Sequence, residues 1–291
     1  MKKPKITFVL LLACFMLTET GCSINNYQST STKEAKQTSL LNTKRSQHIP
    51  SFNNINMDIT NAKVTVEEGK NFAVTYYSRK NDKPTVTVNR NCLWITQKPQ
   101  QRKSYYLRAI LKITIPAKTK LEQFKFKGTC TSLNLNKLYI KQSNIVSNDN
   151  NNDGHGDNTL IKNSTILQGK LYDNVGDLTV KNSNLHSLII NNSIDDVDFK
   201  NVLLDNSELT CACGDISIVN AKITHGYKVI AETGDISIKN AKASGFYSKS
   251  GDENQLFDQE NDSDDGSVLK KGSQKGNVLK VYSNYGTNEI S

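Results

Sequence analysis

Apolar and polar residues alternate along most of the chain after residue 50. Ile55, Met57 and Ile59 show this spacing first, and it recurs in short segments as far as 277–283. A period of two residues is typical of a β-strand with one buried face, whereas an amphipathic helix has a period of about 3.6 residues. The pattern therefore predicts an all-β protein.

A longer repeat is superimposed on this alternation from about residue 125. Its period is 19 to 21 residues, and it aligns the segments IKQS (140–143), IKNS (161–164), VKNS (180–183), FKNV (199–202), IVNA (218–221) and IKNA (238–241). The third residues of these segments are Gln142, Asn163, Asn182, Asn201, Asn220 and Asn240. Gly-Asp pairs keep the same period, at 156–157, 176–177, 214–215 and 234–235. A fixed period with one or two short strands per unit indicates a β-solenoid.

Each part of the repeat has a physical role in such a coil. Glycine tolerates the positive φ of a corner, which gives Gly176, Gly214 and Gly234 structural roles, and the aliphatic residues that follow point into the coil. An aspartate directly after the glycine is expected to bond its own backbone. Asparagines at a constant position can hydrogen-bond from coil to coil, and this prediction applies to Asn163, Asn182, Asn201, Asn220 and Asn240.

The repeat and its interruptions divide a single folded domain into regions. We expect an irregular β region over 51–124, followed by solenoid coils of about 19–21 residues over 125–250. An Asn/Asp-rich insertion interrupts the coils at 147–158. An acidic linker is expected at 251–276, and a C-terminal strand within 277–291.

The first residues have the pattern of a lipoprotein signal peptide, predicted here at 1–21. A basic start is followed by an apolar run, 6–17, that is too short to span a bilayer. Gly21-Cys22 resembles the lipobox of bacterial lipoproteins, although Glu19 stands where that box usually has an aliphatic residue. We therefore expect export and lipid attachment, as with palmitate, at Cys22, which would tether the protein to the outer side of the cell membrane. An ordinary cleaved signal and an uncleaved anchor are the alternatives.

Residues 22–50 continue as a polar segment without apolar periodicity. Such a composition cannot bury enough apolar surface to fold by itself. The segment is therefore expected to be a flexible tether, spanning about 30 Å on average.

Several strand segments resemble one bacterial family. GDISIVNAKI (214–223) and GDISIKNAKA (234–243) are similar to the strand repeats of the bacterial putative-adhesin family, a domain of unknown function described as toastrack-like. The upstream segments INMDITNAKVTVEEG, TVTVNRNCLWITQK and LKITIPAKTKLEQFKFKG resemble its other strands. The resemblance covers about residues 52–245. It implies a surface or envelope β-solenoid, associated with envelope-stress systems, and carries no defined ligand and no active site.

Charge is distributed unevenly along the chain. The net charge is +9, yet residues 23–145 carry 21 basic and 6 acidic side chains while 146–291 carry 13 and 21. In FKFKG (124–128) lysines alternate with phenylalanines, which predicts a strand with one cationic face. Either this face is simply solvated, or it contacts an anionic envelope polymer or lipid surface. The candidate contacts are Lys112, Lys118, Lys120, Lys125 and Lys127. An exported lipoprotein seldom meets nucleic acid, so we expect no nucleic-acid partner.

The insertion contains the beginning of a calcium-loop pattern. Oxygen-bearing side chains stand at positions 1, 3, 5 and 9 with glycine at position 6, and the candidate ligands are Asp149, Asn151, Asp153 and Asp157. Leu160 occupies position 12, where such loops carry a bidentate acid. A flexible insertion without metal is therefore the favoured interpretation and calcium the alternative. No other cofactor is expected.

The remaining reactive residues do not form a catalytic pattern. The four histidines are scattered and show neither triad nor metal spacing, so no catalytic residue and no small-molecule substrate are predicted. Cys92, Cys130, Cys211 and Cys213 follow the predicted anchor. Cys211 and Cys213 are expected to share a strand face. Disulfides and buried thiols are the two alternatives for these cysteines.

These features favour a non-enzymatic, lipid-anchored surface β-solenoid with a binding or adhesin-like role. Two alternatives come from other classes. One is a carbohydrate-active β-helix enzyme of the polysaccharide-lyase kind, which an outward cluster of carboxylates across neighbouring coils would favour. The other is an accessory component of an envelope-stress system.

Overall fold

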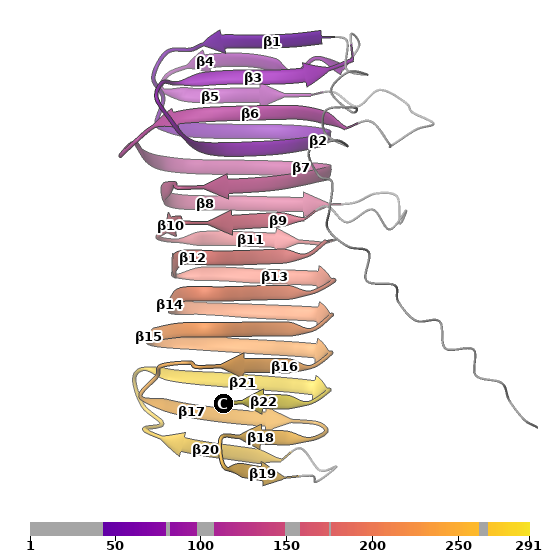
Figure 1. The fold of residues 1–291 in the computed structure, drawn as a ribbon, viewed down its shortest axis with the longest axis vertical. Helices are drawn as coiled ribbons and strands as arrows, with labels where there is room; N and C mark the ends of the chain where they lie inside the picture. The colour runs from indigo at the N-terminus through magenta and orange to yellow at the C-terminus, as the bar shows by residue number, and fades with distance from the viewer. Residues whose placement is uncertain (1–42, 80–81, 98–107, 149–157, 175, 262–266) are drawn as a thin grey trace, which may run out of the picture.

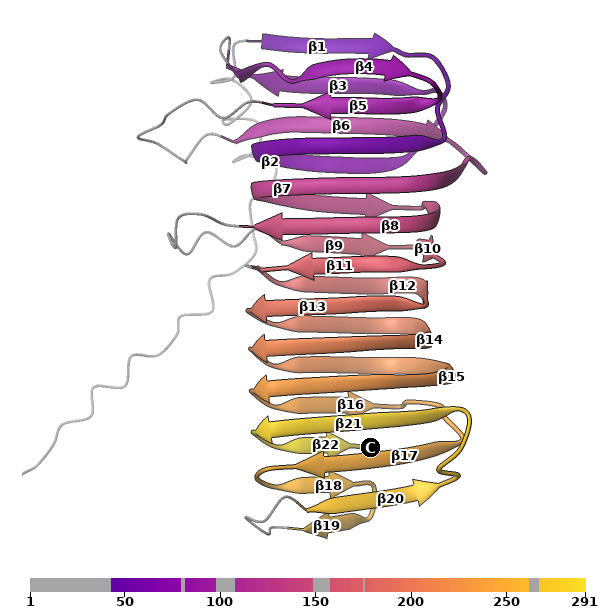
Figure 2. The same cartoon turned by 180° about the vertical axis from the view of Figure 1, so that it is seen from behind.

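The computed structural model describes residues 43–79, 82–97, 108–148, 158–174, 176–261 and 267–291, which form an all-β rod. Strands stack as successive coils along one long axis, with the N-terminal strands at one end and C-terminal strands at the other (Figures 1 and 2). The described strands join in one 22-stranded sheet. The predicted all-β solenoid is therefore confirmed.

Strand β14 (Val197–Cys213) traces most of one coil and shows why the coil has three sides. The chain turns at Asn201 (φ 55°), at Asn206 (φ 44°) and at Gly214 (φ 133°). Left-handed backbone at these points redirects the strand. We call these turns the Asn corner, the polar corner and the Gly-Asp corner. Between them lie a first face (197–200), a second face (202–205) and a long face (207–213).

Neighbouring central coils stack in parallel and in register around an apolar core. Phe199 lies between Val180 of β12 (Leu178–His186) and Ile218 of β15 (Ile216–Thr233). The long face of the preceding coil is β13 (Leu188–Ile194). Buried side chains come from all three faces, including Phe199, Leu204 and Leu209. Each such side chain contributes about 1.5–3 kcal/mol on burial. They belong to one hydrophobic cluster, so the core of the rod is continuous from coil to coil.

The repeated asparagines form a hydrogen-bonded column at the Asn corner. Nδ2 of Asn201 donates to Oδ1 of Asn182 at 3.0 Å, and Nδ2 of Asn220 donates to Oδ1 of Asn201 at 2.9 Å. Equivalent bonds join Asn182 to Asn163 at 3.4 Å and Asn240 to Asn220 at 3.2 Å. All five asparagines have φ between 50° and 58°. Asparagine adopts this conformation more readily than most residues, so the same side chain turns the strand and bonds the next coil.

Gln142 does not belong to this column, so its alignment with the asparagines was wrong. The strand β8 (Tyr139–Asn148) pairs Ile140 with Ile166 of β10 (Thr165–Ile166), and Lys137 (φ 56°) takes the Asn corner of that coil. Gln142 lies instead at the polar corner, paired with Gln123. The four-residue alignment failed because the first face and the second face both end in an apolar residue, a polar residue and a corner residue. The same residue pattern therefore occurs at two different corners.

The solenoid begins earlier than the repeat indicates. Strand β2 (Asn54–Gly69) runs parallel to β7 (Lys120–Asn136), from the pair Asn54–Gln123 to the pair Glu67–Asn136. Strands β5 (Cys92–Thr96) and β6 (Ala109–Pro116) pair with β2 in parallel on its other side. Residues 51–124 therefore contain coils rather than an irregular region. Asn61 (φ 56°) and Cys130 (φ 50°) turn these coils where later ones have Gly-Asp, which hides the repeat.

Antiparallel strands cap the N-terminal end. Strand β1 (Thr43–His48) pairs with β3 (Ala73–Ser78), β3 pairs with β6, and β4 (Thr85–Asn89) pairs with β5. The expected tether over 22–50 thus ends in a strand, because backbone pairing orders residues that lack an apolar face. The predicted signal peptide, Cys22 and the rest of the tether lie outside the described residues.

The middle coils are completed by short strands beside the insertion. These are β9 (Thr159–Lys162), β10 and β11 (Gly169–Asp173), which pair in parallel with β7, β8, β12 and β13. The insertion expected at 147–158 begins only after β8 ends at Asn148. Residues 149–157 lie outside the part of the chain that the structure describes.

At the C-terminal end, order in space departs from order in sequence. Strand β21 (Val278–Tyr285) lies between β15 and β17 (Gly245–Ser250), and β22 (Asn288–Ile290) lies between β16 (Ile236–Lys239) and β18 (Asn254–Leu256) (Figure 1). Strands β19 (Gln259–Asn261) and β20 (Val268–Gly272) add antiparallel pairs beyond β18 and β17. The segment 251–276 is therefore a strand-bearing cap and not a linker, because its backbone is paired with the last coils.

Candidate binding surface

A row of polar side chains follows the polar corner from coil to coil. Successive coils place there Asn54, Gln123, Gln142, Gln168, Ser187, Asn206 and His225. Four surface hollows fall along this one edge, each lined by one or more of these residues. The amides and hydroxyls of this row can donate and accept hydrogen bonds to an extended ligand. We refer to it as the polar edge.

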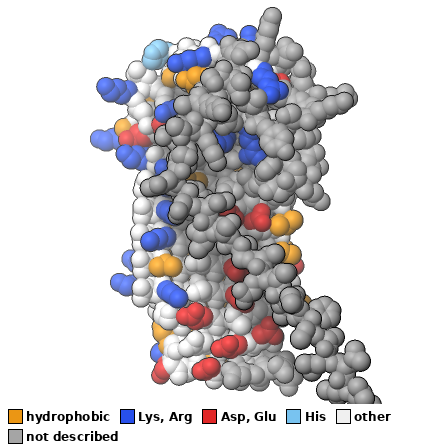
Figure 3. All heavy atoms as spheres, turned by 45° about the vertical axis from the view of Figure 1, so that its right-hand side comes forward, with side chains coloured by type: hydrophobic (Ala, Val, Ile, Leu, Met, Phe, Trp, Pro, Cys, Tyr) orange, Lys and Arg blue, Asp and Glu red, His pale blue; other side chains and the backbone are white. Residues whose placement is uncertain are grey.

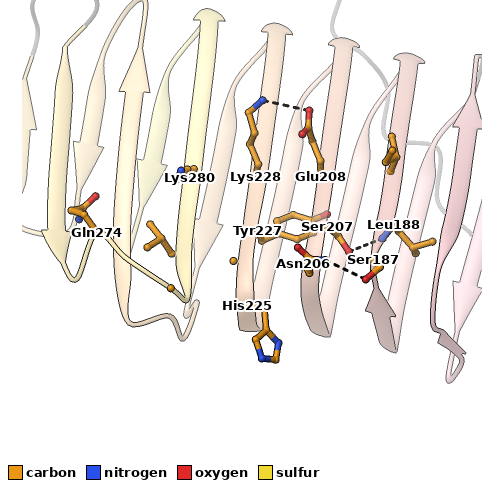
Figure 4. Close-up of a pocket in the computed structure, with 14 residues that line it drawn as sticks. Ser187, Leu188, Asn206, Ser207, Glu208, His225, Tyr227, Lys228, Gln274 and Lys280 are labelled. Carbon is orange, nitrogen blue, oxygen red and sulfur yellow. Dashed lines mark hydrogen bonds and ion pairs between the residues drawn. The ribbon is translucent and has the colours of Figure 1, made fainter.

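One stretch of the polar edge is a groove of about 530 Å³ near the C-terminal coils (Figure 4). Ser187 and Asn206 line it at the polar corner, and Nδ2 of Asn206 donates to Oγ of Ser187 at 3.4 Å. Lys228 and Lys280 stand on neighbouring strands of the long face, and Nζ of Lys228 pairs with Oε1 of Glu208 at 3.4 Å. The groove is open and mixes neutral hydrogen-bonding groups with cations.

Lysines accompany the polar edge along the long face. Lys125, Lys170, Lys228 and Lys280 all point outward from the same position of their coils, and each lines one of the hollows. Trp94, 44% exposed, takes the same position at the N-terminal end. Stacked strands are about 4.8 Å apart, so these groups lie on one line along the rod, and Asn144, Ile189 and Glu208 hold the same position in the coils between them.

The five lysines expected to contact an anion do not share one face. Lys125 and Lys127 lie on the long face, where Phe124 and Phe126, which alternate with them, point inward as expected. Lys112 lies on the first face and pairs with Glu67 at 2.7 Å. Lys118 (φ 66°) is in the turn before β7, and Lys120 lies over the ring of Tyr139, 5.3 Å from its centroid. Among these five, Lys125 lines the polar edge.

Carboxylates gather instead at the Gly-Asp corner, as an aspartate column on successive coils. The backbone N–H of Asp215 donates to Oδ1 of Asp196 at 3.0 Å, that of Asp235 to Oδ1 of Asp215 at 2.9 Å, and that of Thr287 to Oδ1 of Asp235 at 2.8 Å. The expected bond to the residue's own backbone is thus replaced by a bond to the next coil. Figure 3 shows acidic side chains on the C-terminal half of this side.

The aspartate column has the arrangement of a structural ladder rather than of a catalytic pair. Burial raises the pKa of Asp177, and the charges of Asp195, Asp196 and Asp198 raise it further against a backbone hydrogen bond that lowers it. The glycines explain why the coils approach so closely here, since a Cβ on Gly214 or Gly234 would lie 2.3 Å from a carbonyl oxygen of the preceding coil. Gly176 takes part too, because its N–H donates to Oδ2 of Asp195 at 3.0 Å.

A carboxylate and two histidines connect three coils beside the polar edge. Oδ2 of Asp205 lies 2.8 Å from Nδ1 of His186, and Oδ1 lies 2.7 Å from Nδ1 of His225. Burial by itself would raise the pKa of Asp205, but the two imidazole hydrogen bonds outweigh it and hold this pKa below its ordinary value. The scattered positions of the histidines in the sequence conceal this contact, which the coil period brings together.

No disulfide joins the cysteines of the described residues. Cys211 is buried and Cys213 exposed, so the expected shared face was wrong. The alternation breaks because Cys213 directly precedes the Gly-Asp corner. Burial, followed by the charges of Asp196 and its neighbours, raises the pKa of Cys211 to about 11, which suits an inert apolar role.

The proposed calcium ligands Asp149, Asn151, Asp153 and Asp157 lie outside the described residues. Within the described ranges, no cluster of three His, Cys, Asp or Glu side chains is arranged to hold a metal ion. In that same part of the chain, no helix has the length and apolar character to cross a membrane.

Most residues of the polar edge were missed by the sequence analysis. A signal for them exists, because a polar residue stands five positions after four of the five asparagines of the repeat, at Gln168, Ser187, Asn206 and His225. Its residue type varies, so it does not repeat by letter. The shared property appears once the coil register is known.

Comparison with known proteins gives one family model and several solved structures. The family model described as Toastrack DUF4097 matches residues 52–291. A Bacteroides fragilis protein whose crystal structure is named as that of a putative adhesin shares 13% identity, with a TM-score of 0.54 over 86% of this chain and 96% of that one. A putative adhesin from Parabacteroides merdae has 11% identity and a TM-score of 0.40, over the same shares of the two chains. No curated protein matches the chain.

Proposed function

Because the chain belongs to the Toastrack DUF4097 family, whose model spans residues 52–291, we propose that it is a non-catalytic binding protein of the bacterial envelope. The observation that carries this proposal is the polar edge, an open line of amides and hydroxyls flanked by Lys125, Lys170, Lys228 and Lys280. A solved protein of similar fold is named a putative adhesin, and we extend that role to this chain within the proposal.

The proposed ligand is an extended anionic polymer of the envelope that lies along the rod. Single contacts between exposed lysines and anions are weak in water, worth about 0–1 kcal/mol each. A linear array adds many such contacts without requiring an enclosed cavity, and a rigid rod holds them at fixed spacing. Binding of this kind is sensitive to salt because exposed charges are screened within about 8 Å at physiological ionic strength.

The proposal places the rod outside the cell, held to the membrane by lipid on Cys22 and by the polar segment that follows. The supporting features are the basic start, the apolar run 6–17 and the Gly21-Cys22 pair. Metabolic labelling with a palmitate analogue tests this, with loss of label expected in Cys22→Ala. Unchanged labelling of that variant would contradict the anchor.

The binding role is tested at the N-terminal half of the polar edge. Lys125→Gln/Lys170→Gln should lower salt-sensitive retention of the protein on isolated envelopes by about threefold, because two exposed cations of the array are lost. The matched control is Lys162→Gln/Lys181→Gln, which removes two lysines from the first face. Equal retention of both variants and the wild type would refute the role of the polar edge.

A further inference from the structure

A compact patch of tyrosines and lysines covers the C-terminal end of the long face. On β21, Lys280 and Tyr282 point outward. On the adjacent β17, Tyr247 lies beside Lys280 and Lys249 lies beside Tyr282. Lys228 precedes this pair of strands and Lys270 follows it. The six side chains therefore occupy neighbouring positions of one flat sheet. We call this patch the tyrosine–lysine platform.

The two rings of the platform lie together and attract the lysines around them. The centroids of Tyr247 and Tyr282 are 5.4 Å apart, with an angle of 39° between the ring planes. Nζ of Lys228 lies 5.7 Å from the centroid of Tyr282, and Nζ of Lys270 lies 5.6 Å from that of Tyr247. Ammonium groups at this distance are drawn to the face of the ring, which holds them close to the sheet.

The positive charge of the platform is mostly unbalanced. Lys228 pairs with Glu208, but among the residues that the structure describes Lys249, Lys270 and Lys280 have no carboxylate within 4.0 Å. The described acids of the aspartate column lie at the Gly-Asp corner instead, at the other end of the long face. An exposed cluster of like charges is a cost that an anionic ligand would relieve.

The platform continues directly into the groove of the polar edge. Lys228 and Lys280 belong to both, and Gln274 lines the groove beside them (Figure 4). Hydrogen-bonding amides, two aromatic rings and unpaired ammonium groups thus meet at one open surface. Amides suit sugar hydroxyls, aromatic rings suit the apolar C–H side of a pyranose, and ammonium groups suit carboxylates.

We propose that the tyrosine–lysine platform binds a linear acidic polysaccharide, with sugar rings against Tyr247 and Tyr282 and their carboxylates at Lys249, Lys270 and Lys280. This inference rests on the proposed binding function and adds the chemical class of the ligand. A polymer of phosphate groups would meet the lysines but has no ring for the tyrosines. A neutral glucan would meet the rings but leave the lysines unpaired.

Binding of three polymers to the purified full-length chain separates these cases. Polygalacturonate supplies both rings and carboxylates, polyphosphate supplies charge alone, and dextran supplies rings alone. We expect polygalacturonate to bind at least about tenfold more tightly than either, since each lost class of contact is worth about one factor of ten. Equal or tighter binding of polyphosphate or dextran would overturn the proposal.

Three variants then assign the binding to the platform. Lys249→Gln/Lys270→Gln/Lys280→Gln and, separately, Tyr247→Ala/Tyr282→Ala should each weaken polygalacturonate binding about tenfold. The matched control is Lys162→Gln/Lys181→Gln/Lys200→Gln, which removes three lysines from the first face, two of them exposed and Lys162 half-buried, and should leave binding within about twofold. The three platform lysines are exposed, so the lysine variant remains informative if the tyrosine variant melts early. Wild-type binding by the lysine variant, or equal loss in the control, would refute the assignment.

The outcome is distinguishable from failure of the proposed function. If the chain is retained on envelopes through Lys125 and Lys170 but does not bind polygalacturonate, the platform inference alone is wrong. If both retention and polygalacturonate binding are absent, the proposed binding role fails as well.

Discussion

The central coils, from Leu178 to Asn240, and the C-terminal end, from Gly245 to Ile290, share the same faces but are assembled differently. In the central coils the next coil in space is also the next in sequence. At the C-terminal end β21 and β22 enter between coils that precede them in the sequence. The first arrangement needs only local continuity, whereas the second needs a specific partner to be chosen.

Polar residues specify the register in both regions, but from opposite sides of the sheet. The central coils use an outer column of asparagines at the Asn corner. The C-terminal end uses a buried cluster, in which Asn254 bonds Ser248 at 2.7 Å and the backbone oxygen of Ser267 at 2.9 Å, and Asn288 bonds Ser248 at 3.0 Å. Because a buried polar group is costly unless satisfied, this cluster selects one pairing. The difference shows that a repeated outer hydrogen bond is enough to align successive coils of a solenoid. The strands inserted at the C-terminal end are aligned by a buried hydrogen-bond network instead.

Removing the inserted strands should have the largest effect. Deletion of 277–291 takes away Val278, Leu279, Val281 and Ile290, all buried, and separates β17 from its parallel partner. The lost burial is about 6 kcal/mol or more, comparable to the whole stability of many domains. Limited proteolysis should then cleave within 245–272. Continued protection of that segment would show that the cap does not depend on the insertion.

Breaking the buried cluster should cost less, but more than breaking an outer column. Asn254→Ala removes a side chain that bonds Ser248 and Ser267 and leaves their polar atoms buried. We expect a loss of about 3 kcal/mol in the free energy of unfolding, measured by urea denaturation. Gln259→Ala, at an exposed position of β19, is the control and should change stability by less than about 0.5 kcal/mol. A small effect of Asn254→Ala would mean that packing alone fixes the insertion.

The Asn corner allows backbone and hydrogen-bond contributions to be separated. Asn201→Ala removes the side-chain hydrogen bonds to both neighbouring asparagines of the column and forces alanine into φ 55°. We expect it to lower the free energy of unfolding by about 2 kcal/mol. Asn201→Gly loses the same bonds but accepts the backbone conformation, so about 1 kcal/mol is expected. Urea unfolding of the two variants measures the difference. Equal losses would show that the corner conformation contributes nothing measurable.

This contrast also explains how much of the fold could be predicted from sequence. The period, the inward-pointing aliphatic residues and the asparagine column could be predicted because the same residue types recur in each coil. Every coil has to turn at the same corners and bury the same faces. The first coils were not predicted because Asn61 and Cys130 turn the chain there in place of a Gly-Asp pair. The insertion of β21 could not be predicted because no local feature of residues 278–285 specifies β15 and β17 as its partner strands.

The candidate surfaces were predicted less well than the fold. A run of lysines in sequence suggested one cationic face, but three-sided coils send Lys112, Lys120 and Lys125 to three different faces. The tyrosine–lysine platform joins residues from four strands, two of which are antiparallel or inserted. Such groupings depend on spatial order, which the spacing of residues along the chain does not contain.

The smallest predicted effect concerns Asp205, which joins central coils through charge rather than through a repeated letter. Its carboxyl has a lowered pKa because hydrogen bonds from His186 and His225 outweigh its burial. Such a group stabilises the fold fully above its unfolded pKa, about 4, and this stabilisation is lost as pH falls through the folded value. Asp205→Asn should therefore lower Tm by about 2–4 °C at pH 6, with the gap to wild type closing below about pH 4. Thermal melts between pH 6 and pH 3 measure this gap, and Asp198→Asn, at an exposed position of the same coil, should not reproduce it. A gap that persisted at pH 3 would mean that Asp205 acts by packing and not through its charge.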